Sequence, residues 1–300
     1  MLILISDAFD PSLPGILSKY GEVTEDKSRL PEAEIVLVRS KTKVTREYID
    51  SAPKLKMILR GGVGLDNIDQ AYAQQKAIIV QNTADASTTA VAELTFALTL
   101  ALANQVTVAD RSMREGKWLK KELKRVELYG KTLGILGLGR IGLAVAARAR
   151  AFQMRVLGWH PDVHFTDFAE IRQSMEEVLN SSDFVSLHMP LLPETKGIIN
   201  KKTLKEFKDG AYLINTARGK LCNEEDVVQA LKSGKLGGYA TDVWYSDPPE
   251  NSPLFDAPNT VFTPHVGAST KENMLRIGVV IDRLIGEYVT TKQKEKKASR

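Results

Sequence analysis

The chain has a single cysteine, Cys222, so it cannot form an internal disulfide bond. A cysteine content this low is typical of a reducing compartment, and we expect Cys222 to be a small, buried, inert thiol rather than a nucleophile. Long hydrophobic runs are also missing, because the most apolar stretch, residues 94–103, is too short to span a bilayer. Residues 1–7 are too short for a secretion signal and predict a first strand. These absences predict a cytoplasmic protein without a membrane anchor.

A charge imbalance is absent from most of the chain. The formal net charge is +4, and residues 291–300 contribute all of it, with five basic residues and one acidic residue. The rest of the chain holds 36 of the 41 basic and 36 of the 37 acidic side chains. The sequence therefore presents no basic face for nucleic acid, and we interpret its basic end as a solvated terminus. We also expect no metal site.

Residues 132–142 join an apolar strand to the spacing Gly137-x-Gly139-x-x-Gly142, and an alanine-rich helix follows directly. Gly137 allows a tight turn, Gly139 lets the backbone approach a pyrophosphate, and Gly142 lets the helix pack close to the strand. The N–H groups and the positive dipole end of that helix attract phosphates. A glycine-rich turn without a ligand is the alternative. The strand and helix on either side favour a dinucleotide site.

Short apolar runs alternate with helical patterns along the chain, which predicts βαβ units with parallel strands. We therefore predict an α/β protein with two doubly wound parallel-sheet domains, a Rossmann-type NAD domain and a flavodoxin-like substrate domain. The expected strands of the first part are 2–5, 35–38, 56–59 and 77–80. Those of the second part are 132–136, 154–159, 184–187, 211–214, 238–242 and 260–262.

Two helical segments set the expected domain boundaries. Helix 87–104 is apolar on almost every face, which indicates burial on all sides, for instance in a subunit interface. The charged segment 110–130 follows it, and we expect this segment to reach over a second subunit in a homodimer. The final helix has one apolar stripe and is expected to pack back on the first domain. The predicted domains are 1–84 with 271–300, which binds substrate, and 85–270, which binds the dinucleotide, and the two crossings would frame a cleft.

Arg218, Asp247 and His265 each follow a different strand of the second part, and open α/β sheets bind ligands at the carboxyl ends of their strands. An arginine can bind a carboxylate through two hydrogen bonds. A histidine can transfer the proton that accompanies hydride transfer, and a carboxylate can orient that histidine. Each residue has an ordinary alternative role, as an ion-pair partner, a turn residue or a strand-end cap. Their joint placement favours a catalytic group.

The chain resembles the D-isomer-specific 2-hydroxyacid dehydrogenases over nearly its whole length, and most of all the branch that acts on D-3-phosphoglycerate. The resemblance is carried by the motifs at 60–69, 116–118, 130–142, 188–193, 215–219 and 263–270. It implies an NAD-dependent oxidoreductase that transfers a hydride at C2 of a D-2-hydroxy acid. D-3-phosphoglycerate, in serine biosynthesis, is the expected substrate.

The resemblance also implies roles for single residues. Arg218 would hold the substrate carboxylate with the N–H groups of Gly61 and Gly62, and His265 would be the acid–base group that Asp247 orients. The residues implied at the cofactor are Gly137, Gly139, Arg140, Ile141, Gly142, His160, His188, Pro190, Ala217, Asp242, Gly267 and Ala268. Among these, Asp242 would hold the nicotinamide carboxamide, and His188 would line the adenine side through its backbone. The basic residues on the phosphate side would be Arg39, Arg60 and Lys120, although Arg39 and Lys120 have ordinary solvated charges as their alternative.

The chain departs from the family pattern at two residues. Asp247 stands where the family usually has glutamate, so either its loop moves in or its bond to His265 is longer and weaker. His160 stands where an acidic residue usually bonds the adenosine ribose. Since no arginine is nearby and Asp162 would repel a 2′-phosphate, we favour NAD, with NADP as the alternative. The chain also ends soon after its final helix, so we expect it to lack the regulatory domain that some of these enzymes carry.

Two other functions remain open. A glyoxylate or hydroxypyruvate reductase is the nearest alternative. The basic residues Arg39, Arg60 and Lys120 discriminate between the two, because their removal should impair turnover of a phosphorylated substrate far more than that of glyoxylate. An NADH-sensing binding protein, like the corepressors that resemble these dehydrogenases, belongs to a different class. The presence of both Arg218 and His265 favours an enzyme.

Overall fold

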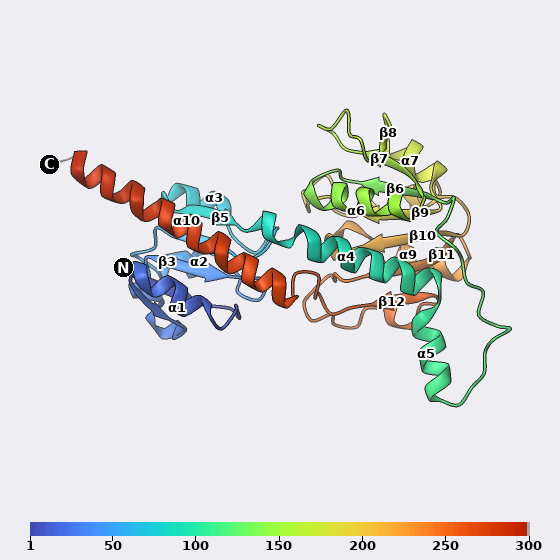
Figure 1. Cartoon of the computed structure of the whole chain (residues 1–300), viewed down its shortest axis with the longest axis horizontal. Helices are drawn as coiled ribbons and strands as arrows, with labels where there is room; N and C mark the ends of the chain where they lie inside the picture. Colours follow the sequence, from blue (N-terminus) through green and yellow to red (C-terminus); the bar gives the residue numbers. More distant parts are fainter. Residues whose placement is uncertain (299–300) are drawn as a thin grey trace. The chain divides into compact units, whose positions relative to one another are not determined.

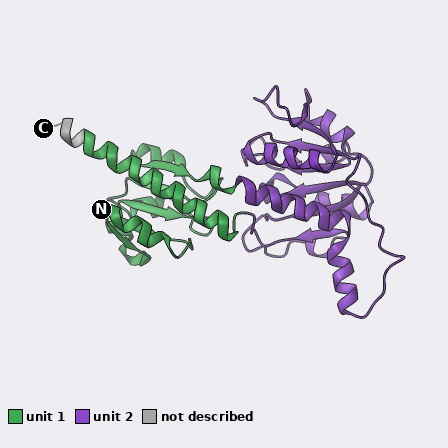
Figure 2. Cartoon of the chain, in the orientation of Figure 1, with its two compact units in different colours: residues 1–87, 268–300 green, residues 88–267 purple. Residues whose placement is uncertain are grey.

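The computed structural model of the chain describes residues 1–298, with side chains up to residue 294, as two compact α/β units. Unit 1 consists of residues 1–87 together with the chain from residue 268 onward, and unit 2 consists of residues 88–267 (Figure 2). The boundaries fall near the crossings expected at Ala84 and Thr270. Unit 1 is therefore built from two separate parts of the sequence.

Unit 1 is a parallel sheet of five strands in the order β2-β1-β3-β4-β5, which is the flavodoxin-like order. Figure 1 labels β3 and β5 of this sheet and several of the helices that flank it. The strands are β1 (Leu2–Ile5), β2 (Glu22–Thr24), β3 (Ile35–Val38), β4 (Met57–Arg60) and β5 (Ile79–Asn82). Its helices are α1 (Leu13–Leu17), η1 (Ser18–Tyr20), η2 (Lys27–Glu32), α2 (Arg46–Asp50), α3 (Gln70–Gln75) and α10 (Lys271–Ala298). The three central strands are buried along their whole length because helices cover both faces of the sheet.

The apolar stripe of α10 completes the core of unit 1. Ile277, Ile281 and Ile285 are fully buried and pack in one cluster with Ile3 and Leu37. Burying an isoleucine side chain contributes about 1.5–3 kcal/mol, so these residues hold the last helix firmly on a sheet that begins at residue 2. The prediction that the final helix packs back on the first domain is confirmed by this cluster.

Unit 2 is a parallel sheet of seven strands in the order β12-β11-β10-β9-β6-β7-β8. The strands are β6 (Thr132–Leu136), β7 (Arg155–Trp159), β8 (Glu170–Ile171), β9 (Phe184–Leu187), β10 (Ala211–Asn215), β11 (Leu236–Thr241) and β12 (Thr260–Phe262). The helices are α4 (Ala84–Ala103), which begins in unit 1, α5 (Val106–Arg114), α6 (Arg140–Ala151), α7 (Met175–Ser181), α8 (Lys201–Leu204), η3 (Gly219–Leu221), α9 (Glu224–Lys232) and η4 (Pro253–Asp256). From β8 inward the order is that of a Rossmann sheet with one strand added, which confirms the predicted fold class.

The order of unit 2 reverses between β6 and β9, because β7 lies on one side of β6 and β9 on the other. In open α/β sheets this switch point, at the carboxyl ends of the strands, is where ligands bind. The glycine motif follows β6 directly. The candidate catalytic residues follow β10, β11 and β12 at the same edge.

Helix α4 is longer than the apolar run that the sequence suggested. Its 20 residues are long and apolar enough to cross a membrane by length and composition, which corrects the expectation drawn from residues 94–103. Most of the helix is nevertheless buried inside the protein, with Ala92, Leu98 and Leu102 in the core of unit 2. Packing in the core therefore accounts for its apolar composition.

Candidate functional site

The glycine motif forms a close-packed turn between β6 and α6. Gly137 has φ +101°, and a Cβ there would lie 2.7 Å from the carbonyl carbon of His188. A Cβ on Gly142 would lie 2.0 Å from the carbonyl oxygen of Gly137. A side chain at Gly139, in contrast, would have no atom within 4 Å. Packing explains the first and third glycines, whereas the second faces open space at the start of α6, which fits the pyrophosphate of a dinucleotide.

His160, at the end of β7, accepts a hydrogen bond at Nδ1 from the backbone N–H of Asp162, at 3.0 Å. The neutral ring therefore carries its proton on Nε2. An imidazole N–H is a donor to a ribose hydroxyl or to a phosphate oxygen, whereas a carboxylate at this position would only accept. His160 consequently lacks the negative charge with which an acidic residue at this position would repel the 2′-phosphate of NADP.

The ring of His188, after β9, turns back toward the strand, where Nε2 and the Ser186 hydroxyl are 2.8 Å apart. Burial lowers the pKa of His188 to about 3. Because an unfolded histidine binds its proton near pH 6.5, protonation of the unfolded chain removes stability as the pH falls from about 6.5 toward 3. The backbone of His188 lies against Gly137. The expected contact with the adenine side through that backbone stays a prediction.

Asp242 fixes the segment that carries His265. Its carboxylate is almost fully buried and accepts three hydrogen bonds. They come from the Thr263 hydroxyl at 2.7 Å and from the N–H groups of Val266 and Gly267, each at 2.8 Å. His265 lies within this clamped segment and has φ +54°, a left-handed conformation that is uncommon outside glycine. The carboxamide-binding role expected of Asp242 stays a prediction.

Asp247 reaches His265 although it is one methylene shorter than glutamate. Its Oδ2 contacts Nδ1 of His265. A carboxylate only accepts hydrogen bonds, so Nδ1 carries the hydrogen and Nε2 is the nitrogen that can exchange a proton with a substrate. The two side chains are 42% and 30% exposed, which leaves the pair accessible to a ligand.

Arg218 follows β10 in a turn that packs against Trp244. A Cβ on Gly219 would lie 2.2 Å from the carbonyl carbon of Trp244, so this position requires glycine. The side chain of Asn215 holds the carbonyl of Arg218 at 2.9 Å, and the indole N–H of Trp244 bonds the carbonyl of Thr263 at 3.1 Å. Trp244 thus joins the turn of Arg218 to the segment of His265. The role of Trp244 could not be predicted from the sequence, because no local pattern marks an aromatic contact between distant strands.

The basic residues of unit 1 gather around the turn after β4. A Cβ on Gly62 would lie 1.6 Å from the guanidinium of Arg60, and one on Gly61 would meet the ring of Phe9 at 2.5 Å and Arg39 at 3.3 Å. Burial lowers the pKa of Arg39. Phe9, which was not predicted from the sequence, is therefore a further candidate for a residue that lines this turn.

The two glycine N–H groups of this turn already have acceptors. Gly61 donates to the carbonyl of Val38, and Gly62 donates to the hydroxyl of Thr83, each at 2.8 Å. A substrate carboxylate would bind these groups only by replacing those acceptors. The partly buried carboxylate of Asp7 also accepts from the Arg39 N–H and so helps to shape this loop.

The remaining predicted residues lie at the ends of elements. Arg140 and Ile141 open α6. Pro190 follows β9, Ala217 follows β10, and Gly267 and Ala268 follow β12. Lys120 is exposed in the loop after α5. Cys222 is buried and its pKa is raised to about 12, as expected for an inert thiol.

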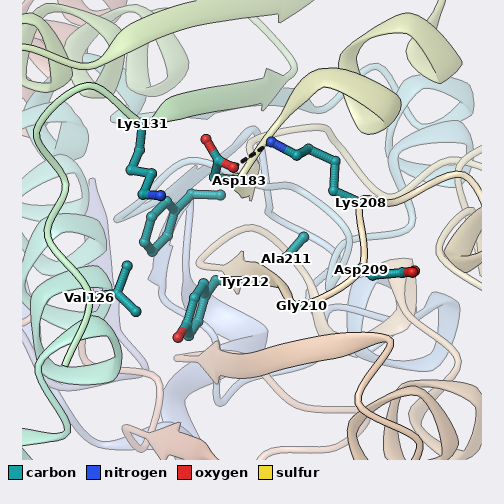
Figure 3. A pocket seen from close by; sticks show the side chains of 9 residues that line it. Val126, Lys131, Asp183, Lys208, Asp209, Gly210, Ala211 and Tyr212 are labelled. Carbon is teal, nitrogen blue, oxygen red and sulfur yellow. Dashed lines mark hydrogen bonds and ion pairs between the residues drawn. The ribbon is translucent and has the colours of Figure 1, made fainter. Parts of the chain in front are cut away.

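A cavity of about 230 Å³ lies at the opposite edge of the unit 2 sheet, where β6, β9 and β10 begin (Figure 3). Asp183 pairs there with Lys208 at 2.5 Å, and the rings of Phe184 and Tyr212 stack. The glycine motif follows the carboxyl end of β6, so this cavity lies at the opposite end of the strands and does not adjoin the motif. Among the side chains described, those of residues 1–294, no three His, Cys, Asp or Glu come together as a metal site.

Unit 2 is thus an α/β dinucleotide-binding sheet with a histidine–carboxylate pair and an arginine at its carboxyl edge. Residues 96–267 match the sequence profile of the D-isomer specific 2-hydroxyacid dehydrogenase NAD-binding domain. The chain belongs to the D-isomer-specific 2-hydroxyacid dehydrogenase family.

Three relatives illustrate the similarity. The D-3-phosphoglycerate dehydrogenase of Methanocaldococcus jannaschii is 42% identical over 93% of this chain and 56% of its own length. A hydroxypyruvate reductase of Thermotoga maritima is 41% identical over 91% of this chain and 90% of its own. The structure of D-lactate dehydrogenase from Aquifex aeolicus, complexed with NAD and lactic acid, matches with TM-score 0.86 and 29% identity over 99% of this chain and 98% of that one. The chain spans about half the length of the phosphoglycerate dehydrogenases that it matches.

The open space at Gly139 gives a direct test of the dinucleotide site. Gly139→Ala is expected to weaken NADH binding about tenfold or more, because the added methyl group occupies space next to the start of α6. It should leave the melting temperature close to that of the wild type, since no protein atom is displaced. Fluorescence titration with NADH and thermal unfolding measure the two effects.

The control for this test is Gly142→Ala, which should lower the melting temperature because its methyl group meets the Gly137 carbonyl. Unchanged NADH affinity in a folded Gly139→Ala variant would contradict the assignment of this turn.

The contact between Asp247 and His265 predicts a catalytic defect in Asp247→Asn. We expect kcat/KM to fall about tenfold or more and its pH profile to change, because an amide neither fixes the imidazole tautomer nor stabilises the imidazolium. The matched control is Ser246→Ala, which alters the same loop at a hydroxyl that bonds Pro248. Superimposable pH profiles for wild type and Asp247→Asn would remove Asp247 from the mechanism.

Proposed function

We propose that the protein is an NAD-dependent dehydrogenase that interconverts a D-2-hydroxy acid and its 2-keto acid. The proposal is carried by one observation, the joint fixation of His265 and Arg218 at the carboxyl edge of the unit 2 sheet. The buried carboxylate of Asp242 holds the segment of His265, and Trp244 connects that segment to the turn of Arg218. The glycine motif follows β6 at the same edge.

In this mechanism, Arg218 binds the substrate carboxylate and polarises the adjacent C2 oxygen. Nε2 of His265 takes the proton of the C2 hydroxyl during oxidation and returns it to the C2 oxygen during reduction. Asp247 stabilises the imidazolium that forms. The turn at 137–142 and the residues around it would hold a nicotinamide cofactor, which would supply the hydride acceptor for oxidation and the hydride donor for reduction. Each residue thus acts on charge that develops at C2 or at its oxygen.

The proposed substrate is D-3-phosphoglycerate, whose oxidation product is 3-phosphohydroxypyruvate. Similarity to phosphoglycerate dehydrogenases at about 40% identity supports it. The grouping of Arg39 and Arg60 around the turn of unit 1 also supports it, because guanidinium groups bind phosphate through paired hydrogen bonds. In this proposal the exposed Lys120 provides a further positive charge for the phosphate.

Hydroxypyruvate reduction is the second candidate. The relative from Thermotoga maritima, a hydroxypyruvate reductase, is 41% identical over 90% of its length. Sequence identity therefore supports hydroxypyruvate reduction as strongly as it supports phosphoglycerate oxidation.

The proposed cofactor is NAD, with NADP as the alternative that His160 leaves open. Its Nε2 hydrogen suits a ribose hydroxyl, while the exposed carboxylate of Asp162 disfavours a 2′-phosphate. The proposed assembly is a homodimer through α4, α5 and the loop that follows. Val106, Met113 and Trp118 in that region are 52%, 56% and 73% exposed, and a second subunit would cover them. In Figure 1, α5 and the loop project from the rest of unit 2.

A spectrophotometric screen of NADH and NADPH oxidation tests the proposal. The 2-keto acids are 3-phosphohydroxypyruvate, hydroxypyruvate, glyoxylate and pyruvate. We expect the highest kcat/KM with NADH and 3-phosphohydroxypyruvate. Arg39→Ala should reduce that value at least tenfold more than the value for glyoxylate, because only the phosphorylated substrate loses an ionic contact.

Equal losses for both substrates would favour the hydroxypyruvate reductase instead. A protein that binds NADH yet reduces none of the four keto acids would be a nucleotide-sensing binding protein, and the proposed activity would then be wrong.

A further inference from the structure

The loop that carries Asp247 is exposed but held at both ends. Residues 245–251 are mostly exposed, whereas Trp244 and Ser252 on either side are each only 8% exposed. The first end is fixed because the indole of Trp244 bonds the Thr263 carbonyl at 3.1 Å. Within the loop, Ser246 bonds Pro248 and so does not attach the loop to the rest of unit 2. Apart from its own contact with His265, Asp247 is therefore positioned by the two ends of the loop.

The second end is fixed by Glu224, a residue far away in the sequence. The hydroxyl of Ser252 donates to Oε2 of Glu224 at 2.8 Å, and the same hydroxyl accepts from the N–H of Leu254 at the start of η4. Glu224 is the first residue of α9 and only 8% exposed. α9 packs directly against η4. Ser252 is thus attached both to η4 and to a helix outside the loop.

A buried carboxyl group is costly unless hydrogen bonds replace its water. Burial raises the pKa of Glu224, and the hydroxyl of Ser252 opposes this by donating to the carboxylate. The start of α9 also favours a negative charge through the helix dipole. An apolar residue at this position would pack without that cost. We therefore attribute the presence of an acidic residue at position 224 to the hydrogen bond that it makes with Ser252.

We propose that Glu224 is a positioning residue for catalysis, which holds Asp247 against His265 by anchoring the loop at Ser252. This inference rests on the proposed function, in which Asp247 fixes the tautomer of His265. With the anchor, both ends of the loop are fixed and the carboxylate stays within hydrogen-bond reach of Nδ1. Without it, the packing of η4 still holds the second end, but no hydrogen bond ties Ser252 to α9, and the carboxylate of Asp247 spends less time at that position.

The decisive readout is the tautomer of His265. It is measured while the imidazole is neutral, by two-bond ¹H–¹⁵N correlation between the carbon-bound ring hydrogens and the ring nitrogens. This measurement needs no turnover, and the chain has only four histidines to assign. We expect Nδ1–H in the wild type. We expect Ser252→Ala to shift His265 toward Nε2–H, as Asp247→Asn should also do, and to lower kcat/KM about tenfold. Ser252→Thr keeps the hydroxyl and should restore both values.

Two further variants separate positioning from stability. Glu224→Met has a similar length, cannot accept a hydrogen bond and is easily buried, so it should fold and yet reproduce the Ser252→Ala defect. Asn223→Ala removes the cap of the same helix, where Asn223 accepts from the Asp226 N–H at 3.0 Å. It should lower the melting temperature by about 2–4 °C, while the His265 tautomer stays as in the wild type.

The inference is overturned if folded Ser252→Ala and Glu224→Met both keep the wild-type tautomer, or if Asn223→Ala changes the tautomer as much as they do. A protein without dehydrogenase activity would still give a tautomer result. Failure of the anchor and failure of the proposed function are therefore distinguishable.

Discussion

The carboxylate of Asp242 is the interaction on which the arrangement of unit 2 depends. It stands at the end of β11 and binds the backbone on both sides of His265, at Thr263 and at Val266 and Gly267. Three hydrogen bonds to this buried carboxylate hold a segment whose central residue, His265, has a left-handed backbone. The histidine is thus set in place by main-chain geometry, and Asp247 then only has to fix the orientation of its ring.

The connection extends from this carboxylate to the rest of the site through close packing. Gly219 meets the backbone of Trp244, so the turn of Arg218 lies directly against the strand end that Asp242 closes. Trp244 in turn packs on Phe255 and Phe262, with ring centroids 5.4 and 5.1 Å apart. An arginine, a histidine and a carboxylate from separate strand ends therefore share one rigid support. Such support is what a preorganised catalytic site requires.

The sequence was sufficient for the parts of the fold that have a strong local pattern. Strands buried on both faces, such as β1, β3 and β9, are continuous apolar runs, and the glycine spacing marks the turn after β6. It was not sufficient for β2 and β8, which are short and partly exposed and exist because a neighbouring strand offers hydrogen bonds. Phe9, Trp244 and Glu224 were missed for a related reason, because each acts through a contact with a residue far away in the chain. It could also not be predicted from the sequence that the N–H groups of Gly61 and Gly62 already have acceptors, because those acceptors are brought near by the tertiary structure.

The central claim is that Arg218 and His265 act on the same carbon, and a double-mutant cycle tests it most directly. kcat/KM is measured for wild type, Arg218→Lys, His265→Asn and the double variant. Each single change should cost on the order of 100-fold or more. If both groups serve one transition state, the double variant should lose less than about tenfold beyond the worse single variant. A loss equal to the product of the two single losses would contradict the account.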